Sequence, residues 1–197
     1  MSKTDETHDI ALPDQVQSWG PVEFIPLDRQ NPQKILDSFF EREKTMQSLA
    51  KYTEIDDEIL LSRLIDAGFD PTTLPALRLV PLAFMAWASD SVTEAEGQAA
   101  VWSMFESQLL QNRAAASRMQ TWLDLRPEQD LWDLWVEYTR YTLDGVPASV
   151  RERMCSDLLH QATAIAMSSG GFLGVGSVCR AERVILDGIR RVFDSYE

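Results

Sequence analysis

Residues 127–143, PEQDLWDLWVEYTRYTL, decide the fold class of this chain. Within them, apolar and aromatic side chains recur every three or four positions, at Leu131, Trp132, Leu134, Trp135, Tyr138 and Tyr141. This spacing puts them on one side of an α-helix, and Pro127 suits the first turn of such a helix. We expect these aromatic side chains, together with Trp122, to lie in a core. A cluster left at the surface would instead mark a binding face.

Helical periodicity also runs through the rest of the chain, and no alternation typical of a strand competes with it. It predicts seven further helices, over about residues 33–51, 56–67, 74–88, 94–110, 113–125, 147–168 and 180–193. Asp56 is suited to cap the second helix and Gly68 to end it, while Pro81 bends or restarts the third. The sequence therefore predicts an all-α protein, a single compact bundle of about eight helices with short connections.

The first 32 residues differ in character from those that follow. They are charged at first and are then broken by Pro13, Pro21, Pro26 and Pro32. We expect residues 1–32 to form a tail that is partly ordered, with Trp19, Phe24 and Ile25 able to hold some of it against the body. The helical domain then comprises residues 33–197.

Charge and composition exclude several classes of protein. The formal net charge of the 197-residue chain is −13, so neither nucleic-acid phosphate nor an anionic lipid surface is expected as the main partner. No run of about 18 apolar residues predicts a transmembrane helix, and the polar N-terminus is not that of a signal peptide. With only Cys155 and Cys179, a reduced, cytoplasmic setting is expected.

Two short segments resemble each other, and each stands at a turn that opens a predicted helix. Residues 91–96, SVTEAE, and residues 177–182, SVCRAE, share four of their six residues. The match indicates a duplicated helix-turn-helix unit. The residues before the two segments differ, because Asp90 precedes the first and Gly176 precedes the second.

The acidic residues of the first turn have two interpretations. Thr93 and Glu96 have the spacing of a capping box, in which each side chain accepts a hydrogen bond from the other residue's backbone amide. This interpretation is favoured for Glu96. Alternatively, Asp90, Glu94 and Glu96 gather oxygen atoms around a hard cation, although their spacing does not follow that of an EF-hand loop. Glu182 is the corresponding acid of the second turn.

The segment 170–177, GGFLGVGS, is rich in glycine and carries two large apolar residues. It nearly matches a phosphate-binding loop, but the lysine that would reach the phosphates is missing and the segment follows a helix. We expect an interhelical loop in which Phe172 and Leu173 insert into the core. Alternatively, these two residues form an exposed apolar tip that touches a protein partner or a membrane surface.

The sequence contains no recognisable catalytic constellation. Of the two histidines, His8 lies in the tail and His160 lies on the polar side of a predicted helix. Five positions at about 100° each separate Cys155 from His160, so the two side chains do not form a nucleophile–base pair. We therefore expect a protein without enzymatic activity, and the only carboxylates open to an unrecognised catalytic site are the turn acids named above.

Two segments resemble the TerB-like family of tellurite-resistance proteins. Residues 77–96, LRLVPLAFMAWASDSVTEAE, are similar to the family's apolar helix, Asp-Gly turn and following helix that opens with Glu. Residues 164–182, AIAMSSGGFLGVGSVCRAE, are similar to the second such turn. The resemblance extends over about residues 54–194.

This resemblance implies a helical bundle with a pseudo-repeat and a stress-associated function close to a membrane, without established enzymatic activity. It also implies that acidic turn residues bind a divalent metal such as Ca²⁺ or Mg²⁺. Asp90 and Glu96 match the turn acids of the first unit, and Glu182 alone matches in the second. The chain departs from the family pattern at Ser91, where the family has Gly, and at Gly176, where an acid is expected. The second departure weakens the case for metal at the second turn.

Three functions follow from these observations. The preferred one is a non-enzymatic interaction or stress-sensing module that has a protein partner and binds a divalent metal at the first acidic turn. A metal-independent structural or partner-binding bundle is the alternative, and an enzyme with a carboxylate site is the third. If the turn carboxylates fold back onto the amides of their own helices, the enzymatic interpretation loses its candidates.

Overall fold

The computed structural model describes residues 32–168 and 178–194, and these residues contain eight α-helices, one 3-10 helix and no strand. The helices are α1 (Pro32–Thr53), α2 (Glu58–Asp66), η1 (Leu74–Leu79), α3 (Val80–Ala86), α4 (Glu94–Glu106), α5 (Arg113–Asp124), α6 (Gln129–Leu143), α7 (Ala148–Ser168) and α8 (Arg180–Asp194). The predicted all-α class is confirmed. The tail residues 1–31 and the glycine segment, with Phe172 and Leu173, lie outside the described residues.

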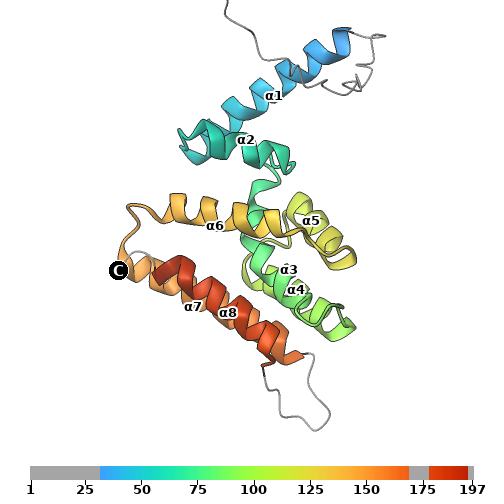
Figure 1. The fold of residues 1–197 in the computed structure, drawn as a ribbon, viewed down its shortest axis with the longest axis vertical. Coiled ribbons are helices and arrows are strands. Elements are labelled where there is room, and N and C mark those ends of the chain that lie inside the picture. The colour runs from blue at the N-terminus through green and yellow to red at the C-terminus, as the bar shows by residue number, and fades with distance from the viewer. Residues whose placement is uncertain (1–31, 169–177, 195–197) are drawn as a thin grey trace, which may run out of the picture.

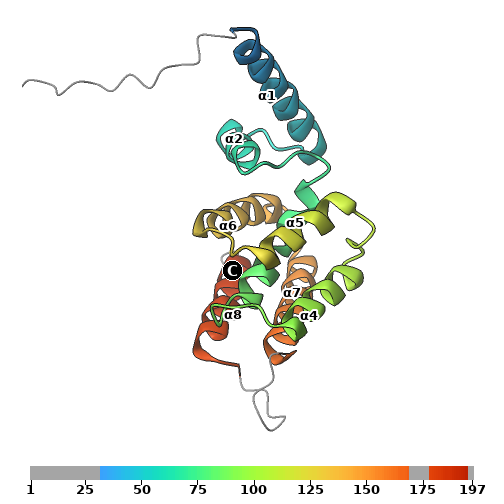
Figure 2. The ribbon, with the colours of Figure 1, turned by 90° about the vertical axis from the view of Figure 1, so that its right-hand side faces the viewer.

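The short helix α3 lies at the centre of the bundle (Figures 1 and 2). It contacts each of the helices α4 to α8. Six of its seven side chains are buried and the seventh, Phe84, is half-buried, as expected of a helix that is apolar on every side. Pro81 stands in its first turn, directly after the 3-10 helix η1. The prediction that Pro81 restarts the third helix is therefore confirmed.

The helices α4 to α8 surround α3. The antiparallel pair α7 and α8 packs side by side along one side of the bundle, and α4 packs against α7 (Figure 1). The helices α1 and α2 lie at one end of the molecule, where α1 packs on α2 and α2 contacts α6. The structure is therefore elongated, with a bundle of α3–α8 and a two-helix extension.

Two local predictions at the helix ends need correction. The carboxylate that caps α2 belongs to Asp57, which accepts hydrogen bonds from the amides of the second and third residues of the helix at 2.9 and 3.0 Å. Asp56 instead accepts a hydrogen bond from the hydroxyl of Tyr141. The helix α4 ends at Glu106, not near residue 110, because Gln108 adopts a left-handed backbone conformation with φ of 57°.

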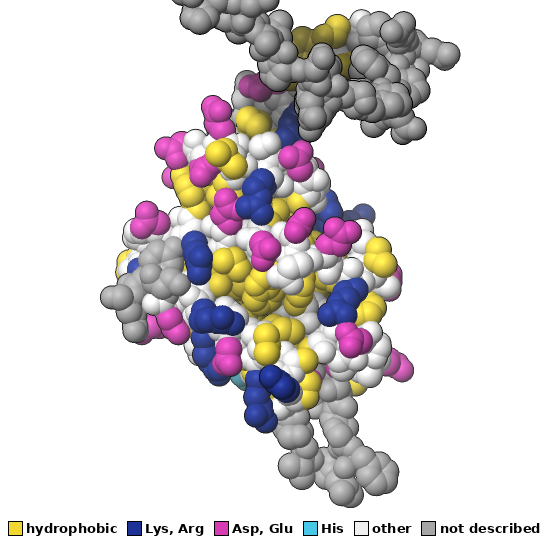
Figure 3. Space-filling model, viewed as in Figure 1, with side chains coloured by type: hydrophobic (Ala, Val, Ile, Leu, Met, Phe, Trp, Pro, Cys, Tyr) yellow, Lys and Arg dark blue, Asp and Glu magenta, His cyan; other side chains and the backbone are white. Residues whose placement is uncertain are grey.

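The predicted burial of the aromatic cluster is confirmed for two of its tryptophans. Trp122 and Trp135 are buried, and the indole Nε1–H of Trp87 donates to the Trp122 carbonyl at 2.7 Å. Trp132 is half-buried and packs edge-on against Phe84, with 5.3 Å between ring centroids. Figure 3 shows one face of the molecule, and hydrophobic side chains reach the surface in the middle of it, between α6 and α8.

Candidate functional site

The first acidic turn, between α3 and α4, assigns each of its carboxylates to a different partner. Asp90 adopts a left-handed conformation, with φ of 65°, and its carboxylate pairs with Arg126 at 2.6 Å. Glu94 accepts a hydrogen bond from the side-chain amide of Gln98 at 3.2 Å. Glu96, only 1% exposed, points back toward the start of its own helix.

The predicted capping box at the start of α4 is present in full. One carboxylate oxygen of Glu96 accepts from the backbone amide of Thr93 at 2.7 Å and from its hydroxyl at 2.8 Å. In return, the Thr93 hydroxyl oxygen accepts from the Glu96 amide at 3.3 Å. The capping interpretation of Glu96 is confirmed, and its carboxylate is used inside the turn.

The second turn repeats this arrangement with sulfur in place of oxygen. The carboxylate of Glu182, which is 5% exposed, accepts from the backbone amide of Cys179 at 2.5 Å. The Glu182 amide in turn donates to the Cys179 Sγ at 3.5 Å. The sequence echo between residues 91–96 and 177–182 therefore corresponds to two helix starts with the same buried, capping glutamate.

These contacts bear on the four acids predicted as metal ligands. Among residues 32–168 and 178–194, no three His, Cys, Asp or Glu side chains are placed to share a metal ion. Glu96 and Glu182 each fold back onto the amides of their own helices. By the criterion stated above, the enzymatic interpretation loses these two carboxylates as candidates.

The remaining titratable candidates are also separate. His160 is exposed on α7, as predicted. Cys155, one and a half turns earlier on the same helix, is half-buried, and this burial raises the pKa of its thiol. A thiol whose pKa is raised carries less thiolate at neutral pH, which does not favour nucleophilic chemistry.

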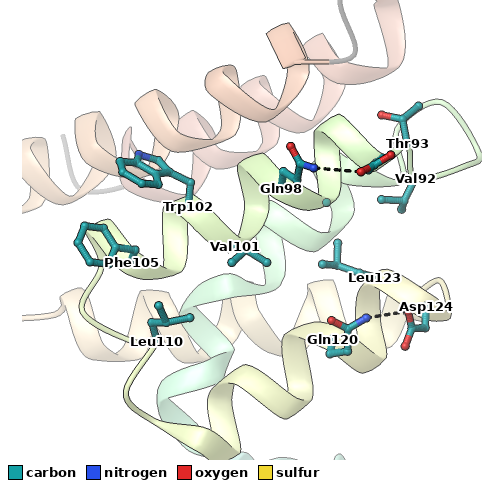
Figure 4. A pocket seen from close by; sticks show the side chains of 12 residues that line it. Val92, Thr93, Gln98, Val101, Trp102, Phe105, Leu110, Gln120, Leu123 and Asp124 are labelled. Atoms are coloured by element: carbon teal, nitrogen blue, oxygen red, sulfur yellow. Dashed lines mark hydrogen bonds between the residues drawn. The ribbon is translucent and has the colours of Figure 1, made fainter.

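An open groove of about 600 Å³ lies between α4 and α5. Figure 4 shows the two helices running antiparallel, with Val101 of α4 and Leu123 of α5 pointing toward each other across the groove. Its apolar lining is contributed by Val92, Val101, Trp102, Phe105, Leu110 and Leu123. A groove of this length and character is the kind of surface that binds a helix or an extended peptide.

Two aromatic residues dominate the surface of this groove. Trp102 is 61% exposed and Phe105 is 58% exposed, and their ring centroids are 5.2 Å apart. The indole Nε1–H of Trp102 donates to the carboxylate of Glu106 at 3.1 Å, which fixes the orientation of the ring. Exposed, oriented aromatic side chains beside aliphatic ones are typical of binding surfaces.

The groove has an acidic end. Because α4 and α5 run antiparallel (Figure 4), Glu94 at the start of α4 and Asp124 at the end of α5 lie at the same end of the groove. Each carboxylate accepts a hydrogen bond from a glutamine that also lines the groove, Gln98 at 3.2 Å and Gln120 at 2.9 Å. This end therefore attracts a basic group on a bound molecule.

Sequence reasoning missed this groove. The signal was present in α4, because its apolar residues fall on both sides of the helix. Ala100 and Met104 are buried in the bundle, whereas Val101, Trp102 and Phe105 face outward. A helix that is apolar on opposite sides needs cover on both, and only the structure identifies the side that the rest of the chain covers.

Known proteins give no guide to the function of this site. Among the described residues, no helix combines the length and apolar character that crossing a bilayer requires. The surfaces of the chain itself are therefore the evidence on its function. Comparison with protein-family models, with curated proteins and with solved structures found no match for this chain.

Proposed function

We propose that this chain is a protein-interaction module whose α4–α5 groove binds an amphipathic helix of another protein. The observation that carries this proposal is the pair Trp102 and Phe105, exposed and oriented along an apolar groove. It is the metal-independent, partner-binding alternative of the three stated above. Metal-linked stress sensing is supported by the family resemblance, whereas partner binding is supported by the geometry of a described surface.

The dimensions of the groove suit a short helix. The lining residues from Thr93 to Phe105 span about 18 Å of helix axis, at 1.5 Å per residue. A partner helix of about twelve residues has the same length, and its apolar side chains at positions i, i+3 or i+4, and i+7 would face the groove. The ligand class is therefore an amphipathic helix with three or four large apolar residues.

Charge gives the bound helix a direction. Glu94 and Asp124 are both exposed at one end of the groove, and the chain as a whole carries a net charge of −13. A lysine or arginine at the matching end of the partner helix gains from both carboxylates. We therefore expect the partner to be basic at one end and apolar along one side.

Selection from a displayed library of helical peptides tests this proposal with the full chain as bait. We expect selected peptides to share the apolar spacing and a basic end. Trp102→Ala should weaken their binding by about 30-fold or more, because truncating a central aromatic anchor costs about 2 kcal/mol or more. Ile59→Ala is the matched control, since Ile59 is an equally exposed apolar residue on α2.

A double variant tests the acidic end of the groove. Glu94→Gln combined with Asp124→Asn should slow association and reduce its dependence on ionic strength, because exposed charges act mainly on the association rate.

Peptides that bind Trp102→Ala as tightly as the unmodified chain would refute the groove as the binding site. A library that yields no binder at all would refute the proposed ligand class.

A further inference from the structure

The N-terminal half of α1 carries an apolar face that no other described residue covers. Ile35, Leu36, Phe39 and Phe40 are all exposed, with Phe39 at 74% and Phe40 at 70%. At about 100° per residue, the four fall within an arc of about 140° on one side of the helix. Four large apolar side chains on one face normally pack against another element, so we expect another segment of protein to cover this face.

The helix α2 lies against a different part of α1. It has 9 residues, against 22 in α1, so it covers only the C-terminal half, where Leu49 is buried. The guanidinium of Arg42 donates to Asp66 and Ser62, both at 2.6 Å, and marks the end of this contact. Beyond it, the N-terminal half of α1 extends past α2 (Figures 1 and 2).

The charges beside the apolar face fit a second copy of the same helix. Asp37 and Lys44 are seven positions apart, so they lie on the same flank of α1. An antiparallel pair of α1 helices places Asp37 of each copy opposite Lys44 of the other. In a parallel pair, the flank that carries both charges would face the opposite flank of the other copy, so Asp37 and Lys44 would not meet. Flanking charges of this kind set orientation in paired helices, and here they favour the antiparallel one.

The wider electrostatics also favour contact at α1. The helix contains four basic and three acidic residues, so it is nearly neutral in a chain whose net charge is −13. Two copies that approach through α1 therefore meet less repulsion than they would through most other surfaces. The present partners of the two charges are weak and exposed: Asp37 accepts from Gln33 at 3.4 Å, and Lys44 lies 3.8 Å from Glu41.

We propose that two copies of this chain form an antiparallel dimer through the N-terminal halves of their α1 helices, with Phe40 of both copies near the two-fold axis. Such an interface is isologous and closed. Its four large apolar residues per copy bring the buried area near the lower bound of about 1,000 Å² for a specific interface, so we expect micromolar affinity. The dimer would carry two α4–α5 grooves and could bind a divalent partner with avidity.

Sedimentation equilibrium of the full chain, from low-micromolar to submillimolar concentration, tests the proposal. We expect a reversible monomer–dimer equilibrium. Phe40→Glu should leave only monomer, whereas Ile59→Glu, a matched change at an exposed apolar residue of α2, should leave the dimer intact. Because Phe40 is exposed, circular dichroism should report unchanged helix content for the variant.

Charge exchange tests the orientation. Asp37→Lys and Lys44→Asp should each weaken the dimer about tenfold, and the double variant should restore it, because it exchanges the two members of each pair. These variants keep every apolar residue of the face. A double variant weaker than both single ones would overturn the antiparallel arrangement.

Two other results would also overturn the proposal. A chain that stays monomeric at submillimolar concentration would mean that residues 1–31 or another protein covers the face. A dimer that survives Phe40→Glu and is lost in Trp102→Ala would place self-association in the α4–α5 groove. Failure of the peptide selection, by contrast, leaves this equilibrium unchanged, so the two proposals fail separately.

Discussion

Replacing Glu96 separates its role as a helix cap from the role of a metal ligand. Its carboxylate is almost fully buried and accepts two hydrogen bonds from Thr93, at 2.7 and 2.8 Å. A hydrogen bond to a charged group contributes about 1.5–3 kcal/mol, but here both bonds share one oxygen and end on an exposed residue that water can reach. The negative charge at the start of α4 adds about 0.3–1 kcal/mol.

From these contributions we expect Glu96→Ala to lower the free energy of unfolding by about 2 kcal/mol. For a chain of this size, that loss corresponds to a decrease in Tm of about 4–8 °C. Glu96→Gln keeps an oxygen that can accept from the Thr93 amide, so its cost should stay below about 1 kcal/mol. Thr93→Ala should cost about 1 kcal/mol through loss of the cap. Urea unfolding followed by circular dichroism measures all three.

Adding divalent cations to the same proteins tests whether the turn acids bind metal. The Asp90 carboxylate pairs with Arg126 and the Glu96 carboxylate with Thr93, so we expect Ca²⁺ and Mg²⁺ to leave the Tm unchanged. A cation that binds the native state would instead raise the Tm with its concentration. Submillimolar binding in calorimetric titration, lost in Asp90→Asn, would show that these acids ligate metal as well as cap the helix.

Three further predictions concern stability. Trp135→Ala, in the core, should destabilise the fold by about 3–5 kcal/mol in urea unfolding. Cys179→Thr should raise the Tm by about 1–3 °C, because a hydroxyl accepts from the Glu182 amide better than sulfur does. Partial burial opposes the charged form of Asp70, but hydrogen bonds from two threonines lower its pKa. Its contribution is therefore lost as pH falls through that lowered pKa, and Asp70→Asn should reduce the acid sensitivity of the Tm.

Most of the fold could be predicted from the sequence, because helix periodicity and end signals are local. The 3.6-residue spacing located the α-helices, Pro81 marked the start of α3, and Gly68, with φ of 77°, ends α2 as expected. One of the two errors arose where two similar residues competed for one role. Asp56 and Asp57 are adjacent acids, and the structure has Asp57 capping α2 while Asp56 accepts a hydrogen bond from Tyr141, 85 positions away.

The candidate groove could not be predicted, because its formation depends on which side of α4 packs inward. Val101 and Trp102 are as apolar as the buried Ala100 and Met104. The contacts of α4 with α3 and α7 select the inner side, and they come from residues distant in the sequence. The uncovered face of α1 has the same origin, since its apolar spacing predicts a helix and says nothing of what packs on it.

The matching segments 91–96 and 177–182 allow α4 and α8 to be compared position by position. In the register set by residues 91–96 and 177–182, the buried Glu96 corresponds to the buried Glu182. The buried Ala100 and Ser103 likewise correspond to buried apolar residues of α8, namely Leu186 and Ile189. The cap and these two inner positions are therefore buried in both units, whereas the buried Met104 corresponds to the exposed Arg190.

The outer side of the helix does not follow this correspondence. In the same register, Val101, Trp102 and Phe105 of α4 correspond to Asp187, Gly188 and Arg191 of α8. The second unit therefore has the same helix start without a large apolar residue at any of these three positions. Gly188 lies against Trp132, where an added Cβ would be 2.9 Å from the indole ring, so packing in α8 accounts for the absence of a side chain there. Asp187 and Arg191 are exposed, and neither is apolar. This difference agrees with the proposal that the α4–α5 groove binds a partner, because the exposed apolar residues occur in α4 alone of the two helices at these positions.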